Sequence, residues 1–149
     1  MACLSKLNGN IVFPASSSDD VYIKNLETPH AATVYDNWPM KRVTTVESVV
    51  DCIIESPSAG VFMKDSNQLV SWITSHVPNG MSKLHTLDEF RQRGYAGLVT
   101  RYLAKRLAQA GYLPFATIAP DNLSSKKCFK SAGFIFSSPF HILSAFRPN

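Results

Sequence analysis

Three short apolar runs, followed at once by one long amphipathic segment, constrain the fold of this chain more than any other feature. The runs lie at 59–63, 69–75 and 81–87, and turn-forming residues at 65–67 and 78–80 separate them. Each run has the length and composition of a strand, and the connections are short enough for hairpins. The sequence therefore predicts an antiparallel meander that leads directly into a helix.

The segment behind the meander has helical spacing, because its small and apolar residues recur at three- and four-residue steps and Gly111 follows the last of them. Residues 1–20 have the composition of an irregular lead-in, and 21–149 are expected to form one domain. We expect a single α+β domain, with a mixed, mostly antiparallel sheet of six to seven strands and about four helices. The other expected strands lie at 21–26, 115–118 and within 134–146, and the other expected helices at 28–36, 45–55 and 123–132.

Composition narrows the class of ligand. Hydrophobic residues make up 45% of the chain, and a net charge of +4 is spread along it rather than gathered in one block. Diffuse positive charge suits an anionic small molecule, whereas nucleic-acid binding would need a basic and aromatic platform that the sequence lacks. No apolar run approaches the roughly 18 residues that span a membrane. We expect neither nucleic acid nor a membrane as a partner.

The cysteines and histidines suggest no metal site. The three cysteines are far apart and odd in number, and the four histidines lack the spacing of metal ligands. Reduced thiols and a cytoplasmic location are the simplest expectation. A mitochondrial location stays open as an alternative, because residues 1–18 contain a lysine and several serines but no acid.

The junction between the last strand of the meander and the long helix is the first candidate site. Its sequence from Arg91 to Ala96 places Gly94 just before the helix, with Arg91 and Arg93 on either side of Gln92. Backbone N–H groups at a helix N-terminus attract anions, and a glycine lets the backbone approach a phosphate closely. Taken alone, the loop is better explained as an ordinary helix start with two solvated arginines.

A second segment, Asn122 to Phe134, follows the expected strand at 115–118. Together with 84–96 it resembles the GNAT N-acetyltransferase superfamily. Within that superfamily, His85-Thr86-Leu87, the arginine loop, Pro120-Asp121-Asn122 and Gly133-Phe134 are similar to the C-terminal domain of glycine N-acyltransferase-like proteins. The resemblance runs from about residue 21 to residue 140. Full-length members of that subfamily carry an additional N-terminal half.

The resemblance implies a binding site for an acyl-coenzyme A. The backbone of Leu84, His85 and Thr86 would pair with the pantetheine amides, and a backbone N–H of this strand would stabilise the oxyanion as an amine attacks the thioester. The pyrophosphate would lie on the loop, and two further residues would lie near the cofactor. The implied cofactor-binding residues are Leu84, His85, Thr86, Arg91, Gln92, Arg93, Gly94, Tyr95, Ala96, Asn122 and Phe129.

Two departures from the family pattern bear on catalysis. Phe129 stands where many members have a tyrosine that protonates the leaving thiolate, and Gly80 aligns with the glutamate base of glycine N-acyltransferases. His85 is our candidate for the base, since an imidazole is largely neutral at physiological pH. A half-buried strand histidine without a catalytic role is an equal alternative, and Asp88 and Glu89 are further candidates.

The sequence thus predicts an acyl-CoA-dependent N-acyltransferase that acts on a primary amine, with glycine or another small amino acid as the expected acceptor. The acceptor's carboxylate would need a cation, for which Lys83 and Arg42 are candidates. The alternative function is a catalytically silent acyl-CoA-binding module. The sequence leaves the acyl group and the oligomeric state open.

Overall fold

The computed structural model describes residues 19–76 and 80–137 and the backbone of residues 141–144. Its centre is a seven-stranded sheet in the order β1-β2-β3-β4-β5-β7-β6. Neighbouring strands are antiparallel except β4 and β5, which are parallel. This confirms the predicted α+β class and the mostly antiparallel sheet. The strands are β1 (Val21–Lys24), β2 (Ser58–Met63), β3 (Leu69–His76), β4 (Gly80–Thr86), β5 (Phe115–Thr117), β6 (Phe134–Phe136) and β7 (His141–Ser144).

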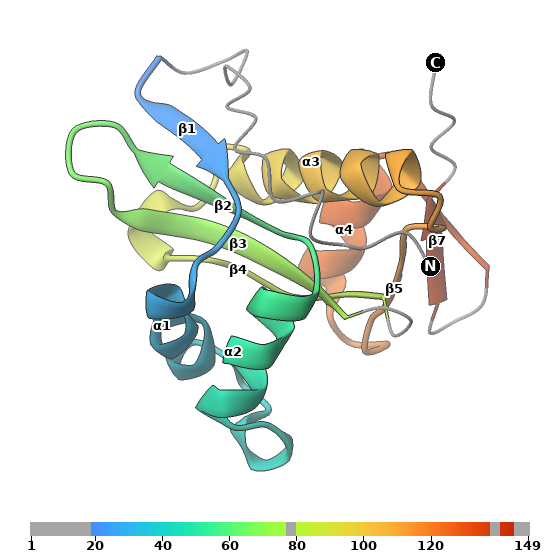
Figure 1. Ribbon diagram of the computed structural model, residues 1–149. Coiled ribbons are helices and arrows are strands. Elements are labelled where there is room, and N and C mark those ends of the chain that lie inside the picture. Colours follow the sequence, from blue (N-terminus) through green and yellow to red (C-terminus); the bar gives the residue numbers. More distant parts are fainter. Residues whose placement is uncertain (1–18, 77–79, 138–140, 145–149) are drawn as a thin grey trace.

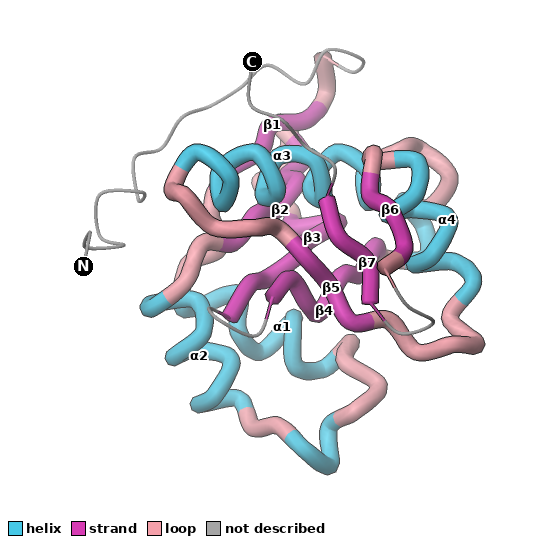
Figure 2. The backbone as a smooth tube through the Cα atoms, turned by 90° about the vertical axis from the view of Figure 1, so that its right-hand side faces the viewer, coloured by secondary structure: helices cyan, strands magenta, loops and turns pink. Residues whose placement is uncertain are grey.

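Helices cover both faces of this sheet. Figures 1 and 2 show α3 and α4 against one face and α1 and α2 against the other. The predicted number of about four helices is confirmed, although the first begins with a separate 3-10 turn. The described helices are α1 (Ala31–Asp36), α2 (Val46–Glu55), α3 (Tyr95–Gln109) and α4 (Leu123–Ser131), with 3-10 turns η2 (Thr28–His30), η3 (Lys41–Val43) and η4 (Asp88–Phe90).

Two apolar clusters hold the layers together. The larger one joins α3 and α4 to the sheet and includes the buried Leu103 and Phe129. The smaller one lies beneath α1 and α2 and centres on Trp72, whose side chain is fully buried. Because each face of the sheet has its own apolar cover, the central strands read as nearly continuous apolar runs rather than as strict alternation.

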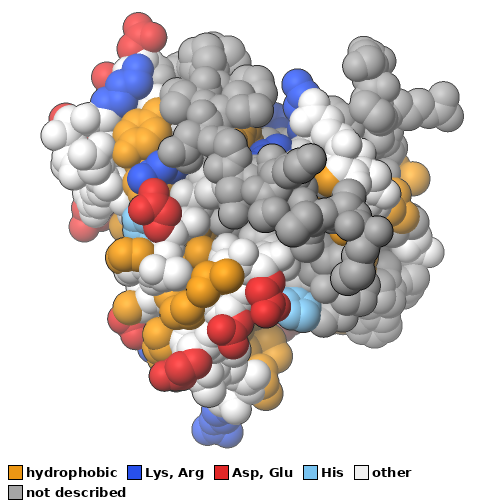
Figure 3. All heavy atoms as spheres, in the orientation of Figure 1, with side chains coloured by type: hydrophobic (Ala, Val, Ile, Leu, Met, Phe, Trp, Pro, Cys, Tyr) orange, Lys and Arg blue, Asp and Glu red, His pale blue; other side chains and the backbone are white. Residues whose placement is uncertain are grey.

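Helix α2 shows how the sequence sets one of these faces. Thr45 caps it, because its hydroxyl accepts a hydrogen bond of 3.1 Å from the backbone N–H of Ser48. Val49, Cys52 and Ile53 are buried against the sheet, while its acidic residues are exposed. Figure 3 shows acidic side chains gathered over the lower part of the molecule, where α1 and α2 lie.

The three strands of the meander form as predicted, with small shifts at their ends, whereas residues 78 and 79 of its second predicted turn lie outside the described part of the chain. Asn67 takes a positive φ of 57° in the β2–β3 turn, and its N–H donates to the carbonyl of Met63 (2.9 Å). Of the one or two closing strands predicted within 134–146, the described residues contain two, β6 and β7. Residues 1–18, most of the predicted lead-in, lie outside the described part of the chain.

The described residues contain no helix that is long and apolar enough to cross a membrane. They also contain no group of three or more histidine, cysteine or acidic side chains that could hold a metal ion.

Candidate active site

Strand β4 is irregular in its middle. Against β3, His85 lies opposite Trp72 and Ser82 lies opposite Thr74, so β4 has one more residue than β3 between these two pairs. Lys83 absorbs the extra length with a φ of +55°, which is rare for a residue with a side chain. Such a β-bulge bends a strand and redirects its backbone groups.

The same strand parts from β5. Among the described residues, the ladder between them consists of Met81 opposite Ala116. β5 ends one residue later, at Thr117, whereas β4 runs on to Thr86. One edge of β4 from the bulge onward therefore lacks a strand partner, which leaves backbone groups for an extended ligand to bind.

Hydrogen bonds to β3 show which backbone groups point into this gap. The carbonyl of His85 accepts from the hydroxyl of Ser71 on β3 (3.2 Å), and the N–H of Leu87 donates to a β3 carbonyl (2.9 Å). The N–H and C=O of one residue point to the same side of a strand, and successive residues alternate. Leu84 and Thr86 therefore present their backbone to the gap, while His85 presents its backbone to β3.

One loop further along, the N-terminus of α3 is uncapped. Gly94 takes the cap position with a φ of +80°, and no side chain bonds to the first turn. The first intrahelical bond runs from the N–H of Leu98 to the carbonyl of Gly94 (3.1 Å), so the N–H groups of 95–97 have no partner within the helix. A Cβ built at Gly94 would meet no atom within 4 Å, and Gln92 also has a positive φ of 61°. This open turn is suited to an anion.

The two loop arginines make hydrogen bonds and an ion pair with residues just before them in the chain. The Nε of Arg91 donates to the carbonyl of Thr86 (3.2 Å), and its Nη2 lies 3.0 Å from a carboxylate oxygen of Asp88. The guanidinium of Arg93 donates to the carbonyl of Glu89 (3.2 Å). All these side chains are exposed, so such bonds are weak and exchange readily for a phosphate. The carbonyl that accepts the hydrogen bond from Arg91, that of Thr86, is one of the backbone groups that face the gap.

The side chains of Tyr95 and Leu84 attach the two sides of this site to the core. The side chain of Tyr95 is only 6% exposed and packs in the cluster between α3 and the sheet. It anchors the first turn of α3, so only its backbone N–H is directed to a ligand. Leu84 packs against the same cluster and fixes the strand side of the gap.

His85 is half-buried on the face of β4 that α1 and α2 cover. Its ring lies 5.1 Å from that of Trp72. Burial lowers the pKa of His85, the positive charge of Arg91 lowers it further, and Asp88 opposes both effects. The imidazole is therefore neutral at physiological pH and able to accept a proton.

The other two predicted contacts have clear structural partners. The Oδ1 of Asn122 accepts a hydrogen bond of 3.0 Å from the N–H of Ser125, which makes it the N-cap of α4. Phe129 is 3% exposed and meets Phe134 edge to face, with ring centroids 4.9 Å apart. Its ring fills the core between α4 and the sheet.

Gly80 has a structural reason to be glycine. Its φ is +90°, and a Cβ built there would lie 2.7 Å from the carbonyl oxygen of Phe115. A glutamate at this position would clash with backbone, so the base expected from the resemblance has no room here. The remaining cysteine near the site, Cys128, is a half-buried thiol whose pKa is raised by burial.

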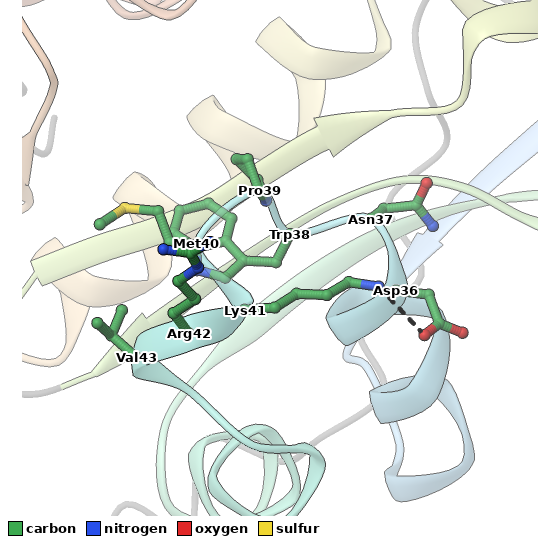
Figure 4. A pocket seen from close by; sticks show the side chains of 8 residues that line it. All are labelled: Asp36, Asn37, Trp38, Pro39, Met40, Lys41, Arg42 and Val43. Carbon is green, nitrogen blue, oxygen red and sulfur yellow. Dashed lines mark ion pairs between the residues drawn. The ribbon is translucent and has the colours of Figure 1, made fainter.

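A pocket flanks β4 on the α1 side, and of its lining residues only Arg42 was singled out from the sequence. Residues 36–43, between α1 and the end of η3, line an open pocket of about 710 Å³ (Figure 4). The Nζ of Lys83 lies 5.5 Å from the centroid of the Trp38 ring in this segment, so the pocket adjoins the bulge in β4. Lys83 and His85 both lie on this side of the strand.

The sequence profile of the FR47-like protein family matches residues 58–139, more than half of the chain. The chain belongs to the FR47-like family. The match spans β4, the loop before α3 and α4, and thus contains every predicted cofactor-binding residue and the candidate base His85. No curated protein matches the chain significantly.

Solved structures share the fold of this FR47-like chain. A Drosophila protein superposes with a TM-score of 0.79 at 21% identity, over 93% of this chain and 46% of its own. The PaiA N-acetyltransferase of Thermoplasma acidophilum, solved in complex with coenzyme A, gives 0.65 at 14% identity over 85% and 99%. The ribosomal-protein-S5-alanine acetyltransferase of Vibrio fischeri gives 0.61 at 12% over 90% and 94%.

These likenesses establish the GNAT fold. The chain spans just under half the length of the Drosophila protein that it matches. The finer resemblance to glycine N-acyltransferase-like proteins stays a prediction.

Proposed function

We propose that this chain is an acyl-CoA-dependent N-acyltransferase, which moves an acyl group from coenzyme A to a primary amine within a ternary complex. The observation that carries the proposal is the proximity, along one short stretch of chain, of two separate binding features. The bulged edge of β4 offers backbone groups to an extended amide-containing arm, and the uncapped start of α3 offers N–H groups to phosphates. Acyl-CoA has both chemical parts.

The residues that would hold acyl-CoA follow from this geometry. Leu84 and Thr86 direct backbone groups into the gap, and Gln92 to Ala96 form the anion-binding turn with Arg91 and Arg93 beside it. The carbonyl of Thr86 already accepts a hydrogen bond from the Nε of Arg91. Binding of the phosphates by Arg91 would therefore help to expose the carbonyl for the pantetheine arm.

The chemistry is a direct transfer. The amine nitrogen forms a bond to the thioester carbon, the carbon–sulfur bond breaks, and the amine loses one proton. His85 is our candidate to accept that proton, because its imidazole is neutral and lies on the strand that carries the gap. The backbone N–H of Leu84, next to the bulge, is our candidate for stabilising the oxyanion. Phe129 cannot protonate the thiolate, which would take its proton from solvent.

The second candidate function is a silent acyl-CoA-binding module. Two observations favour it: the buried phenylalanine at 129 and the steric exclusion of any side chain at Gly80. Such a module would keep the phosphate turn and the strand gap without turnover.

Thiol release separates the two functions. The chain is incubated with acetyl-CoA or benzoyl-CoA and with glycine, glutamine, a polyamine or a lysine peptide, while calorimetry measures binding of coenzyme A. Thiol release that depends on the acceptor supports the transferase. Binding without release for every acceptor supports the module, and absence of both contradicts the proposed site.

A further inference from the structure

The pocket formed by residues 36–43 lies beside β4, the strand that carries the proposed acyl-CoA site. It adjoins the bulge of β4 through the contact between Lys83 and the Trp38 ring. His85, the candidate base, lies on the same side of the strand. An acceptor in the pocket would therefore reach the thioester from the side opposite α3.

The pocket is larger and more apolar than glycine requires. Its volume is about 710 Å³ and it is open to solvent, so it has room for a side chain much larger than the hydrogen of glycine. Trp38, Pro39, Met40 and Val43 supply apolar walls (Figure 4). Met40 is 56% exposed and Val43 is 74% exposed, so both have apolar surface that a ligand could cover.

The charge of the pocket is positive. Lys41 is balanced by Asp36, with 3.7 Å between Nζ and Oδ1. Within the described part of the chain, Arg42 and Lys83 have no carboxylate partner. The acidic residues of α2, in contrast, lie on its exposed face. A polyamine or a lysine side chain would meet like charges in the pocket, whereas a carboxylate would be attracted.

We infer that the acceptor is an α-amino acid with a bulky apolar side chain, whose carboxylate pairs with Lys83 or Arg42 and whose side chain packs on Trp38, Met40 and Val43. This inference rests on the proposed function of the site. It refines the acceptor class, because glycine would leave the apolar walls uncovered.

The test compares four acceptors that separate charge from apolar bulk: phenylalanine, glycine, phenethylamine and spermidine. We expect kcat/KM for phenylalanine to exceed that for each of the others by roughly 10-fold or more, from the lost carboxylate contact or the lost apolar contact. Equal or better use of glycine, phenethylamine or spermidine would overturn the inference while leaving the transferase intact.

Variants assign the effect to the pocket. Lys83→Met should lower kcat/KM for phenylalanine roughly 10- to 100-fold, while Lys83→Arg retains most of it. Lys64→Met, in the exposed turn after β2, is the matched control and should change nothing. Met40→Ser combined with Val43→Ser should reduce the preference for phenylalanine over glycine. Unchanged kinetics in both pocket variants would contradict the assignment.

A binding measurement keeps the inference separable from catalysis. N-acetyl-phenylalanine, the expected product, is titrated into the chain in the presence of coenzyme A. If no acceptor is turned over, the proposed function fails, but product binding that Lys83→Met weakens and Lys64→Met does not still supports the pocket. Absence of such binding overturns the pocket as well.

Discussion

Gly94 offers the sharpest perturbation of the phosphate turn, because Gly111 provides a matched control. Both residues have a positive φ, +80° and +87°, and a Cβ built at either meets no atom within 4 Å. Replacing either by alanine therefore introduces the same backbone strain, about 1–2 kcal/mol for a left-handed residue. We expect each variant to melt roughly 2–8 °C below the parent chain.

Of the two substitutions, only Gly94→Ala should lower the affinity for coenzyme A. A methyl group at Gly94 lies beside the N–H groups of the first turn of α3, whereas Gly111 follows the other end of that helix. Loss of one charge-assisted hydrogen bond is enough to weaken binding by roughly 10-fold. Calorimetric titration of both variants with coenzyme A measures this directly. Equal affinities for Gly94→Ala and Gly111→Ala would refute the assignment of the turn.

Three further predictions concern charged groups. His85→Ala should lower the transfer rate by roughly 10²–10⁴ with little change in acyl-CoA affinity, and remove a rising limb of the pH–rate profile below about pH 6.5; full activity at every pH would return His85 to a structural role. Asp88→Asn removes the ion pair with Arg91 and should tighten coenzyme A binding by about two- to fivefold. Glu89→Gln removes an equal charge but no ion pair with Arg91, so it serves as the control in the same titration. An identical effect of both variants would contradict the idea that Asp88 holds Arg91 away from the phosphates. The pKa of His30 is lowered, chiefly by burial, so its stabilising contribution is complete above the unfolded-state pKa near 6.5 and is lost as pH falls below it. The melting temperature should therefore be lower at pH 5.5 than at pH 7.5, and His30→Gln should make this difference smaller. The same difference in the parent chain and in the variant would contradict the role of His30.

The elements that local patterns specify were predictable. Turn residues between the strands of the meander, the spacing along α3 and the threonine cap of α2 each depend on neighbours within a few positions. The open turn before α3 was predictable for the same reason, because Gly94 and the two arginines stand next to the start of this helix; its binding of phosphate stays a prediction. These signals placed the strand, the loop and the helix correctly.

The bulge in β4 was not predictable, because register between strands depends on a partner far along the chain. Lysine is not a residue type that favours a positive φ, so nothing at Lys83 signals the bulge. The pairing of Met81 with Ala116 depends on the arrangement of the whole sheet. The shape of the pocket was not predictable for a related reason. Arg42 was named as a candidate cation, but residues 36–43 have no helical or strand period, and their closeness to Lys83 arises only from the fold.

Two predicted site residues have structural roles that their spacing did not reveal. Asn122 caps α4 through Ser125, and Phe129 packs on Phe134. Both roles depend on neighbours within a few residues, so an N-cap and a core position could have been read from the sequence beside the family pattern. Whether either residue also touches a ligand stays a prediction.

The central claim is that coenzyme A binds along β4 and the turn before α3. The most direct test is a titration of the isotopically labelled chain with coenzyme A, in which NMR monitors the chemical shift of each backbone amide. The proposed site predicts the largest changes at the amides of Leu84 and Thr86 and from Gln92 to Gly97, with the exposed face of α2 unaffected. It needs no acceptor and no turnover. Saturation without changes in these two segments, or changes centred elsewhere, would contradict the site.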